Sequence, residues 1–367
     1  MTDVNSTVQN SAPVTEEKDY ILEVDGLKQY FPVSKDFFGK PTRYLRAVDG
    51  VSFKLERGKT LGVVGESGCG KTTLGRTILR LYDVTEGSAK YTTEDKNGNP
   101  VTYDLATISK KELYNLRTEL QLVFQDPYSS LPPRMTVGSI IGEAVKVHKL
   151  VPDDKISEYV RGVMARCGLQ PHHYDRYPHE FSGGQRQRIC IERALAVNPK
   201  LVICDEPVSA LDVSIQAQII NLLKKLQREE GMSYIFISHD LSVVKYISDE
   251  IAVMYLGNIV EMGSAKEICS NPRHPYTQAL FSAVPVANPH AKSDPVALEG
   301  ELPSPANPPK GCKFHTRCKY CTEKCKDCAP PTVDVGGGHY VACHLAAEEL
   351  DADDAITENG AHDADEN

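Results

Sequence analysis

The chain has 367 residues, with 41 Lys and Arg against 50 Asp and Glu, and a formal net charge of −9. Nine acidic residues and no basic ones lie between Glu348 and Asn367, so residues 1–347 carry 41 of each sign. This balance argues against a general nucleic-acid binder, which needs a basic excess. No run approaches the roughly 20 apolar residues of a membrane-spanning helix, and the start lacks the apolar segment of a secretion signal. We therefore expect a cytosolic protein.

The first strands are predicted from alternating apolar and polar residues. Residues 1–18 are polar and patternless, which predicts disorder. The segments YILEVDGLKQYF (20–31) and LRAVDGVSFKL (45–55) alternate and predict antiparallel strands.

Short continuous apolar runs predict strands that are buried on both faces of a parallel sheet. These runs are LGVVG (61–65), LVICD (201–205) and YIFIS (234–238). Helical patterns follow them, at 71–82, 214–230 and 241–249. Strands that alternate with helices indicate an α/β sheet covered by helices.

Residues 65–72, GESGCGKT, fit the pattern G-x-x-x-x-G-K-[ST] between a predicted strand and a predicted helix. The glycines let backbone N–H groups turn toward phosphate oxygens, and the helix start attracts the anion. Lys71 would reach the β- and γ-phosphates, and Thr72 would offer its hydroxyl to Mg²⁺. By chance, a chain of this length would match about one time in a hundred. The segment predicts a nucleotide site.

Four further segments carry residues suited to nucleotide chemistry. Asp205 and Glu206 end an apolar run, where Asp205 would hold Mg²⁺ and Glu206 would activate a water. Ser-Gly-Gly at 182–184 opens a helix, which makes a second anion-binding helix start. Gln125 and His239 each follow a predicted strand. Alone, each segment has an ordinary structural explanation.

In this order and spacing, the motifs resemble the ATP-binding subunits of ABC transporters over about residues 20–260. The resemblance implies an α/β P-loop ATPase domain with a RecA-like core, an antiparallel β subdomain and a helical subdomain. It also implies a head-to-tail dimer in which each ATP lies between the phosphate loop of one subunit and residues 182–185 of the other. Since the chain carries one set of motifs, a second ATPase chain is expected.

The resemblance implies a role for each matching residue. Glu206 would be the catalytic carboxylate, Gln125 would sense the γ-phosphate and Mg²⁺, and His239 would contact the γ-phosphate. Tyr30 would stack on adenine, with Phe31 and Tyr44 as alternatives. The implied ATP-binding residues are Gly65, Glu66, Ser67, Gly68, Cys69, Gly70, Lys71, Thr72 and Thr73, and the implied Mg²⁺ ligands are Thr72, Gln125 and Asp205. Ser182, Gly183, Gly184 and Gln185 would contact ATP across the dimer, and Ser209, Ala210, Leu211 and Asp212 would cross its interface.

Three segments resemble the oligopeptide/dipeptide importer branch: AVDGVSF (47–53), FQDPYSSLPPRMTVG (124–138) and NPRHPYTQAL (271–280). The opening LKQYFPVSKDFFGK resembles the second of that branch's two ATPase subunits. This implies two transmembrane permease subunits, contacted around residues 126–140, and an extracellular substrate-binding protein. The chain would then lie at the cytoplasmic face of the membrane. The alternative is a soluble ABC-type ATPase that acts on ribosomes or nucleic acid, with a cysteine cluster as its binding module.

Six of the eleven cysteines lie between Cys312 and Cys343, and in a cytosolic chain such a cluster favours a metal site over disulfides. Cys312, Cys318, Cys325 and Cys343 resemble the ligands of a [4Fe–4S] cluster in the branch's C-terminal extension, and Cys321 and Cys328 are additional. Zinc, unliganded thiols and disulfides remain open, although the tight spacing from 318 to 328 fits zinc poorly. Nearby bases would offset thiolate charge or form a solvated face; they are Lys310, Lys313, Arg317, Lys319, Lys324 and Lys326.

These patterns predict the domain organisation. We expect an ABC ATPase domain at 19–260, with a helical subdomain at about 108–195. A Cys-rich C-terminal extension would follow at 261–347, and the acidic tail at 348–367 would be disordered.

Overall fold

The computed structural model describes residues 18–38, 40–209, 211–283, 298 and 300–350. The disorder predicted for 1–18 and for the acidic tail falls almost wholly outside these ranges. Residues 344–350, where the tail was expected to begin, are helical. Within the described ranges, no helix is long and apolar enough to cross a bilayer.

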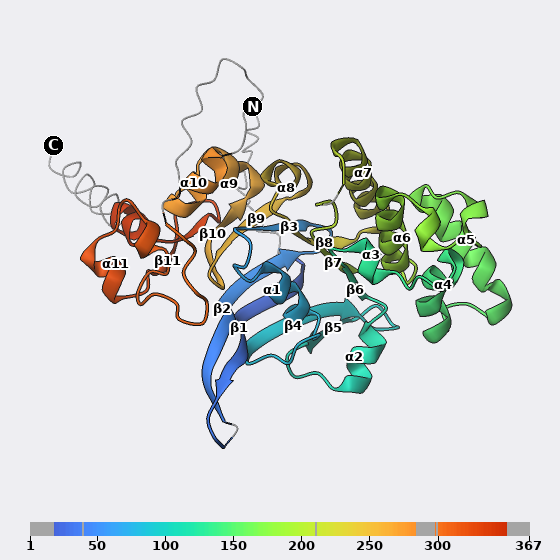
Figure 1. Cartoon of the computed structure of the whole chain (residues 1–367), viewed down its shortest axis with the longest axis horizontal. Helices are drawn as coiled ribbons and strands as arrows, with labels where there is room; N and C mark the ends of the chain where they lie inside the picture. Colours follow the sequence, from blue (N-terminus) through green and yellow to red (C-terminus); the bar gives the residue numbers. More distant parts are fainter. Residues whose placement is uncertain (1–17, 39, 210, 284–297, 299, 351–367) are drawn as a thin grey trace, which may run out of the picture.

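One sheet is antiparallel and has four strands in the order β2-β1-β4-β5. Its strands are β1 (Tyr20–Lys35), β2 (Pro41–Glu56), β4 (Glu86–Glu94) and β5 (Pro100–Asp104). In β2, Val51, Phe53 and Leu55 are buried and the residues between them are exposed, as the alternating pattern predicts. The prediction of antiparallel strands is confirmed by the pairing of β1 with β2. Their far ends form a hairpin that extends away from the body of the molecule (Figure 1).

The second sheet has eight strands in the order β11-β12-β10-β9-β3-β8-β7-β6. Its strands are β3 (Thr60–Val64), β6 (Leu120–Val123), β7 (Leu201–Asp205), β8 (Ser233–Ile237), β9 (Glu250–Tyr255), β10 (Asn258–Ser264), β11 (Thr332–Asp334) and β12 (Tyr340–Ala342). From β9 to β6, neighbouring strands are parallel. Every residue of β3, β7 and β8 is buried, which confirms the prediction of a buried parallel sheet and the α/β class.

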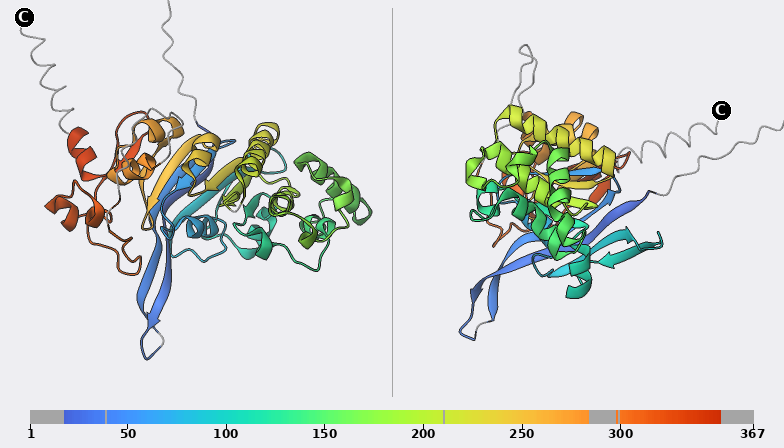
Figure 2. Two further views of the ribbon diagram at one scale, coloured as in Figure 1. Left: turned by 45° about the horizontal axis from the view of Figure 1, so that its top comes forward. Right: turned by 90° about the vertical axis from the view of Figure 1, so that its right-hand side faces the viewer.

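Helices cover this sheet and also form a separate lobe (Figures 1 and 2). They are α1 (Lys71–Ile78), α2 (Lys110–Leu116), α3 (Pro127–Ser130), α4 (Val137–Val147), α5 (Ile156–Cys167), α6 (Gly183–Leu195), α7 (Val213–Glu230), α8 (Leu241–Ile247), α9 (Ala265–Ser270), α10 (Pro275–Ser282) and α11 (Glu323–Asp327). Helices α4, α5 and α6 share a core of their own that includes Val137, Val160 and Ile189. The interval 108–195 also contains β6, which pairs with β7 in the central sheet.

The C-terminal residues are built into the central sheet, because β12 pairs with β10. Behind this pairing, Glu261 is fully buried and its carboxylate lies 2.7 Å from Nε2 of His339. The same carboxylate accepts the backbone N–H groups of Arg273 at 2.7 Å and His274 at 2.9 Å. A buried carboxylate requires such partners, so these contacts hold residues 273, 274 and 339 against β10 of the central sheet.

An aromatic cluster joins the extension to the sheet. Phe314 is 3% exposed and packs against Tyr255 and Tyr276, with ring centroids 5.3 and 5.5 Å apart. His274 completes the cluster, and its Nδ1 accepts the backbone N–H of Tyr276 at 3.0 Å. Burial lowers the pKa of His274 to about 4, so the ring is neutral and can accept this bond at physiological pH.

We expect Phe314→Ala to lower the free energy of unfolding by about 3 kcal/mol, because it removes a buried aromatic ring and leaves a cavity. Urea denaturation followed by circular dichroism measures the loss. Phe37→Ala is the matched control, since this side chain is 98% exposed and its removal should change stability by less than about 0.5 kcal/mol. Equal effects of the two substitutions would contradict the packing described.

Candidate active site

The loop between β3 and α1, residues 65–70, has the backbone of an anion-binding loop. Gly65, Gly68 and Gly70 have φ of 148°, 81° and 109°, which favour glycine. A Cβ at Gly70 would collide with the carbonyl oxygen of Ala47, and one at Gly65 with that of Met254. As the N-cap of α1, Gly70 offers no side chain to the first N–H groups of the helix, so these donors can bind an anion.

Lys71 is 5% exposed, and its ammonium is folded back into the loop. Its Nζ donates to the carbonyl oxygens of Gly65 at 2.7 Å and Glu66 at 3.0 Å. Ser67 is exposed, Cys69 is buried, and the carbonyl of Thr73 in the first turn of α1 accepts the Thr77 hydroxyl at 2.7 Å. A phosphate oxygen would be a stronger acceptor for Lys71 than a neutral carbonyl.

Thr72 and Asp205 meet beside this loop. The Thr72 hydroxyl donates to Oδ1 of Asp205 at 2.7 Å, and Asp205 is 1% exposed. Burial raises the pKa of Asp205, and the Thr72 bond and Arg76, 3.7 Å from Oδ2, oppose the shift. Oδ2 has no hydrogen-bond partner among the described residues. A hydroxyl beside an unsatisfied carboxylate oxygen is a donor set that fits Mg²⁺.

Two predicted residues converge on the carboxylate of a third. Nε2 of Gln125 donates to Oε2 of Glu206 at 2.9 Å, and Nδ1 of His239 lies 3.3 Å from the same oxygen. They follow β6, β7 and β8, whose carboxyl ends share one edge of the sheet. Glu206 also has a φ of 47°, in the left-handed region that side chains avoid. Such strain is frequent in active sites, where surrounding structure fixes a side chain.

The structure keeps the Ser182–Gln185 segment apart from the phosphate loop. Ser182 caps α6: its Oγ accepts the N–H of Gln185 at 3.4 Å, and Oε1 of Gln185 accepts the N–H of Ser182 at 3.1 Å. Gly183 lies near Leu211, and Gly184 packs closely on Ile215. Among the described residues, no hydrogen bond joins 182–185 to 65–73.

The segment 209–212 connects β7 to α7. The hydroxyl of Ser209 donates to the carbonyl of Glu206 at 3.2 Å, and Asp212 caps α7 by accepting the N–H of Ile215 at 3.0 Å. Ala210 lies outside the described residues. The segment therefore begins three residues after Glu206 and is hydrogen-bonded to it.

Tyr30 is half-buried and its polar edge is occupied. Its hydroxyl donates to Asp49, and the Arg46 guanidinium lies over one face of the ring, 5.8 Å from its centroid. Only the other face could stack on adenine. Of the alternatives, Phe31 packs edge-on against Tyr82 at 5.2 Å, and Tyr44 is 43% exposed.

Sequence reasoning missed the contacts between the C-terminal extension and this site. Arg317 donates two hydrogen bonds to the carboxylate of Glu66, at 2.7 and 3.0 Å. Lys313 donates to Asp49 at 2.7 Å. Both basic side chains were expected to offset thiolate charge or lie in solvent, and both instead pair with carboxylates of the first domain. No local pattern could reveal this, since 251 residues separate Glu66 from Arg317.

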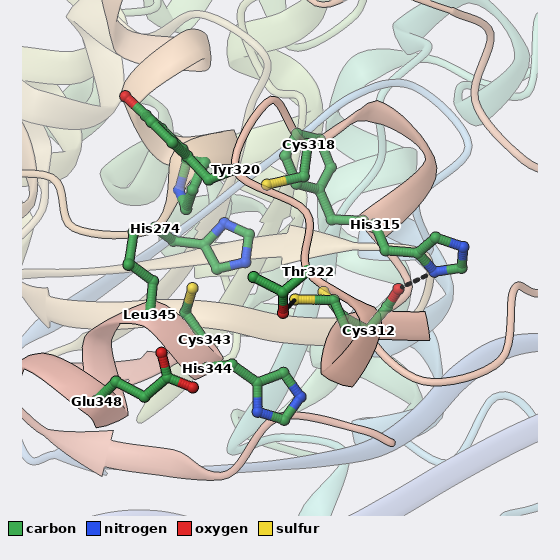
Figure 3. Close-up of a pocket in the computed structure, with 13 residues that line it drawn as sticks. His274, Cys312, His315, Cys318, Tyr320, Thr322, Cys343, His344, Leu345 and Glu348 are labelled. Carbon is green, nitrogen blue, oxygen red and sulfur yellow. Dashed lines mark hydrogen bonds between the residues drawn. The ribbon is translucent and has the colours of Figure 1, made fainter. Parts of the chain in front are cut away.

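The four cysteines predicted as ligands line a single pocket that is partly open to solvent. Figure 3 shows the thiols of Cys312, Cys318 and Cys343 directed into this space, and Cys325 also lines it. Cys321 and Cys328 do not line the pocket. All eleven cysteines lie in the described ranges, and no disulfide joins them.

No three His, Cys, Asp or Glu side chains in the described ranges are arranged to hold a single metal ion. Burial raises the pKa of Cys312 to about 11, and neighbouring thiols, Cys325 first, add to the shift.

Known families match two parts of the chain. Residues 48–209 match the family described as ABC transporter. Residues 260–325 match the family described as the oligopeptide/dipeptide transporter C-terminal region.

The chain matches curated relatives over nearly their whole length. The chain is 51% identical to the oligopeptide transport ATP-binding protein AppF of Bacillus subtilis, over 89% of this chain and 98% of that one. It is 50% identical to the dipeptide transport ATP-binding protein DppF of Haemophilus influenzae, over 89% and 97%. It is 49% identical to the oligopeptide transport ATP-binding protein OppF of Escherichia coli, over 90% and 97%.

Solved structures share the fold. The ATP-binding cassette MJ0796, in a dimeric post-hydrolysis state bound to ADP and Pi, has a TM-score of 0.57 at 23% identity, covering 66% of this chain and 98% of that one. CbiO1 of Clostridium perfringens, part of the ABC transporter complex cbiONQ, has a TM-score of 0.56 at 28% identity, covering 69% and 92%.

Lys71→Ala should weaken binding of a fluorescent ATP analogue by about tenfold or more, because it removes the ammonium that the loop holds for a phosphate. Equilibrium titration of the full chain measures this. Lys224→Ala is the control, since its Nζ bonds the carbonyl of Tyr246 on α8 instead. Undiminished binding by the Lys71 variant would show that the nucleotide binds elsewhere.

Proposed function

This chain belongs to the ATP-binding subunits of ABC transporters, in the oligopeptide/dipeptide branch, and we propose that it hydrolyses ATP to energise peptide import through a membrane transporter. One observation carries the site assignment. Gln125 and His239 both contact the carboxylate of Glu206, next to the Thr72–Asp205 pair and the phosphate loop. The relatives described above are transport proteins, so the alternative that acts on ribosomes or nucleic acid is not supported.

The proposed chemistry divides the work among these residues. Residues 65–73 bind the phosphates. When they do so, the Lys71 ammonium exchanges its hydrogen bonds to the carbonyls of Gly65 and Glu66 for bonds to phosphate oxygens. Thr72, Asp205 and Gln125 would hold Mg²⁺, which when bound neutralises charge on the phosphates. Glu206 accepts a proton from the attacking water, and His239 contacts the γ-phosphate.

A complete site requires a second ATPase chain. Within this chain, Ser182–Gln185 and the phosphate loop belong to different parts of the fold, with α6 and α1 apart from each other (Figure 1). We propose that a sister ATPase supplies its own signature segment to this phosphate loop and receives residues 182–185 in return. Residues 209–212 would cross the interface.

The transporter would be completed by two permease subunits, contacted around residues 126–140, and by an extracellular binding protein that delivers the peptide. The chain would lie at the cytoplasmic face of the membrane as a peripheral subunit. Co-purification of the tagged chain with permease subunits and the sister ATPase tests this assembly, and recovery with ribosomes instead would contradict it.

Glu206→Gln should bind ATP and turn over about 10²–10⁴-fold more slowly, because it keeps the shape of the side chain and removes the base. Phosphate release by the assembled transporter measures turnover, and nucleotide titration measures binding. Glu229→Gln, an exposed residue of α7, is the control. Near-normal turnover in the Glu206 variant would remove this residue from its proposed role.

We also propose that Cys312, Cys318, Cys325 and Cys343 hold a [4Fe–4S] cluster. The donor set supports this, since four thiols share one pocket from which Cys321 and Cys328 are absent. Four thiolates also bind zinc, so metal content decides between the two.

Protein purified without oxygen should absorb near 400 nm and contain about four irons per chain, as thiolate-bound [4Fe–4S] clusters do. Cys325→Ser should lose both signals, whereas Cys321→Ser should keep them, because only Cys325 lines the pocket. Stoichiometric zinc without iron would contradict the proposal. So would an equal loss in the two variants.

A further inference from the structure

The phosphate loop contains a carboxylate of its own. Glu66 is the second residue of the loop, its carbonyl oxygen accepts the Lys71 ammonium, and its side chain is 27% exposed. An unpaired negative charge at this place would repel a triphosphate, since charges a few ångströms apart interact strongly near a protein surface. The loop therefore needs a means to cancel this charge.

Arg317 of the C-terminal extension meets that need. Its Nη1 and Nη2 donate to the two carboxylate oxygens of Glu66 at 2.7 and 3.0 Å, which is a bidentate pair. The Arg317 side chain is only 5% exposed, and its guanidinium lies 6.0 Å from the ring centroid of Tyr255. A planar guanidinium in such a pair fixes the orientation of the carboxylate as well as its charge.

The backbone of Glu66 is held by the same part of the molecule. Its N–H donates to the hydroxyl of Tyr276 at 2.9 Å. Tyr276 is fully buried and packs on Tyr255 and Phe314, the latter only three residues from Arg317. Side chain and backbone of Glu66 are thus both bound by residues that follow the parallel sheet in sequence.

We propose that Arg317 is a positioning residue of the nucleotide site: it neutralises and orients Glu66, so that the phosphate loop presents no net negative charge to ATP. The C-terminal extension is then part of the nucleotide site. This inference rests on the proposed ATP-binding function and adds a residue to it from outside the ATP-binding motifs.

Two explanations of the Arg317–Glu66 pair predict different effects of removing Glu66 on ATP affinity: Arg317 cancels the charge of Glu66, or the pair only fixes the shape of the loop. If the pair only fixes the loop, Glu66→Gln and Arg317→Met should be equally harmful. If Arg317 acts by neutralising Glu66, loss of Arg317 exposes a negative charge, whereas loss of Glu66 removes one. The two single variants should then have opposite or unequal effects on ATP affinity.

The test uses the full chain and equilibrium titration with a fluorescent ATP analogue and Mg²⁺. Arg317→Met should raise the dissociation constant about tenfold at low ionic strength, and added salt should narrow the difference by screening. Glu66→Gln should bind ATP more tightly than wild type, because it removes a negative charge from the phosphate loop and leaves the Arg317 guanidinium in place. The double variant should return to within about twofold of wild type, since the charge that Arg317 cancels is then absent.

Arg166→Met is the matched control, because it removes an ion pair with Glu230 at 2.9 Å between α5 and α7. Thermal denaturation checks that each variant is folded, and if Arg317→Met is not, the Glu66→Gln titration decides. A tenfold loss in Glu66→Gln, or no rescue in the double variant, would overturn the proposal. Normal binding by folded Arg317→Met would overturn this proposal and leave the proposed function intact. Failure of the wild-type chain to bind the analogue would overturn the proposed function as well.

Discussion

The parallel register of β3, β8, β7 and β6 is the constraint on which the site depends. Val63 pairs with Ile237, Asp205 also with Ile237, and Val123 with Cys204. The carboxyl ends of the four strands therefore meet at one edge, where the phosphate loop and the acidic, amide and imidazole side chains follow. Because these strands are buried on both faces, a shift by one residue would exchange the side chains packed on the two faces and disrupt a close-packed core. Core packing thus fixes the spacing of groups far apart in the sequence.

The C-terminal extension adds a second constraint on the phosphate loop, through its contacts with Glu66. It is anchored by buried contacts, of which the Glu261–His339 pair and the Phe314 aromatic cluster are the most enclosed. From this anchored position it reaches Glu66 through Arg317 and Asp49 through Lys313. Without these contacts, the conformation of the phosphate loop would depend on its own residues and the adjoining strand and helix. Here Glu66, the second residue of the loop, is also held by segments distant in sequence.

Much of the fold and the site is predictable from local pattern. The strands β3, β7 and β8 are continuous apolar runs because both faces are buried, and the loop at 65–72 has a chemistry with few alternatives. The short strand β6 was also expected, as the strand before Gln125, although its four residues lie within the interval interpreted as a helical subdomain. The Arg317–Glu66 pair depends on the tertiary fold and leaves no signal at any fixed spacing. Lys313 and Arg317 are largely buried in the fold, and buried charges require partners of opposite sign. Composition alone could not show that these side chains would be buried.

The most direct test of this account is a crystal structure of the full chain with Mg²⁺ and a slowly hydrolysed ATP analogue. We predict that the triphosphate is bound by residues 65–73, and that Lys71 Nζ has moved from the Gly65 and Glu66 carbonyls to a phosphate oxygen. Mg²⁺ should lie beside Thr72 and Asp205, and Glu206 should face the γ-phosphate. A nucleotide bound elsewhere, or a Glu206 carboxylate turned away from the γ-phosphate, would contradict it.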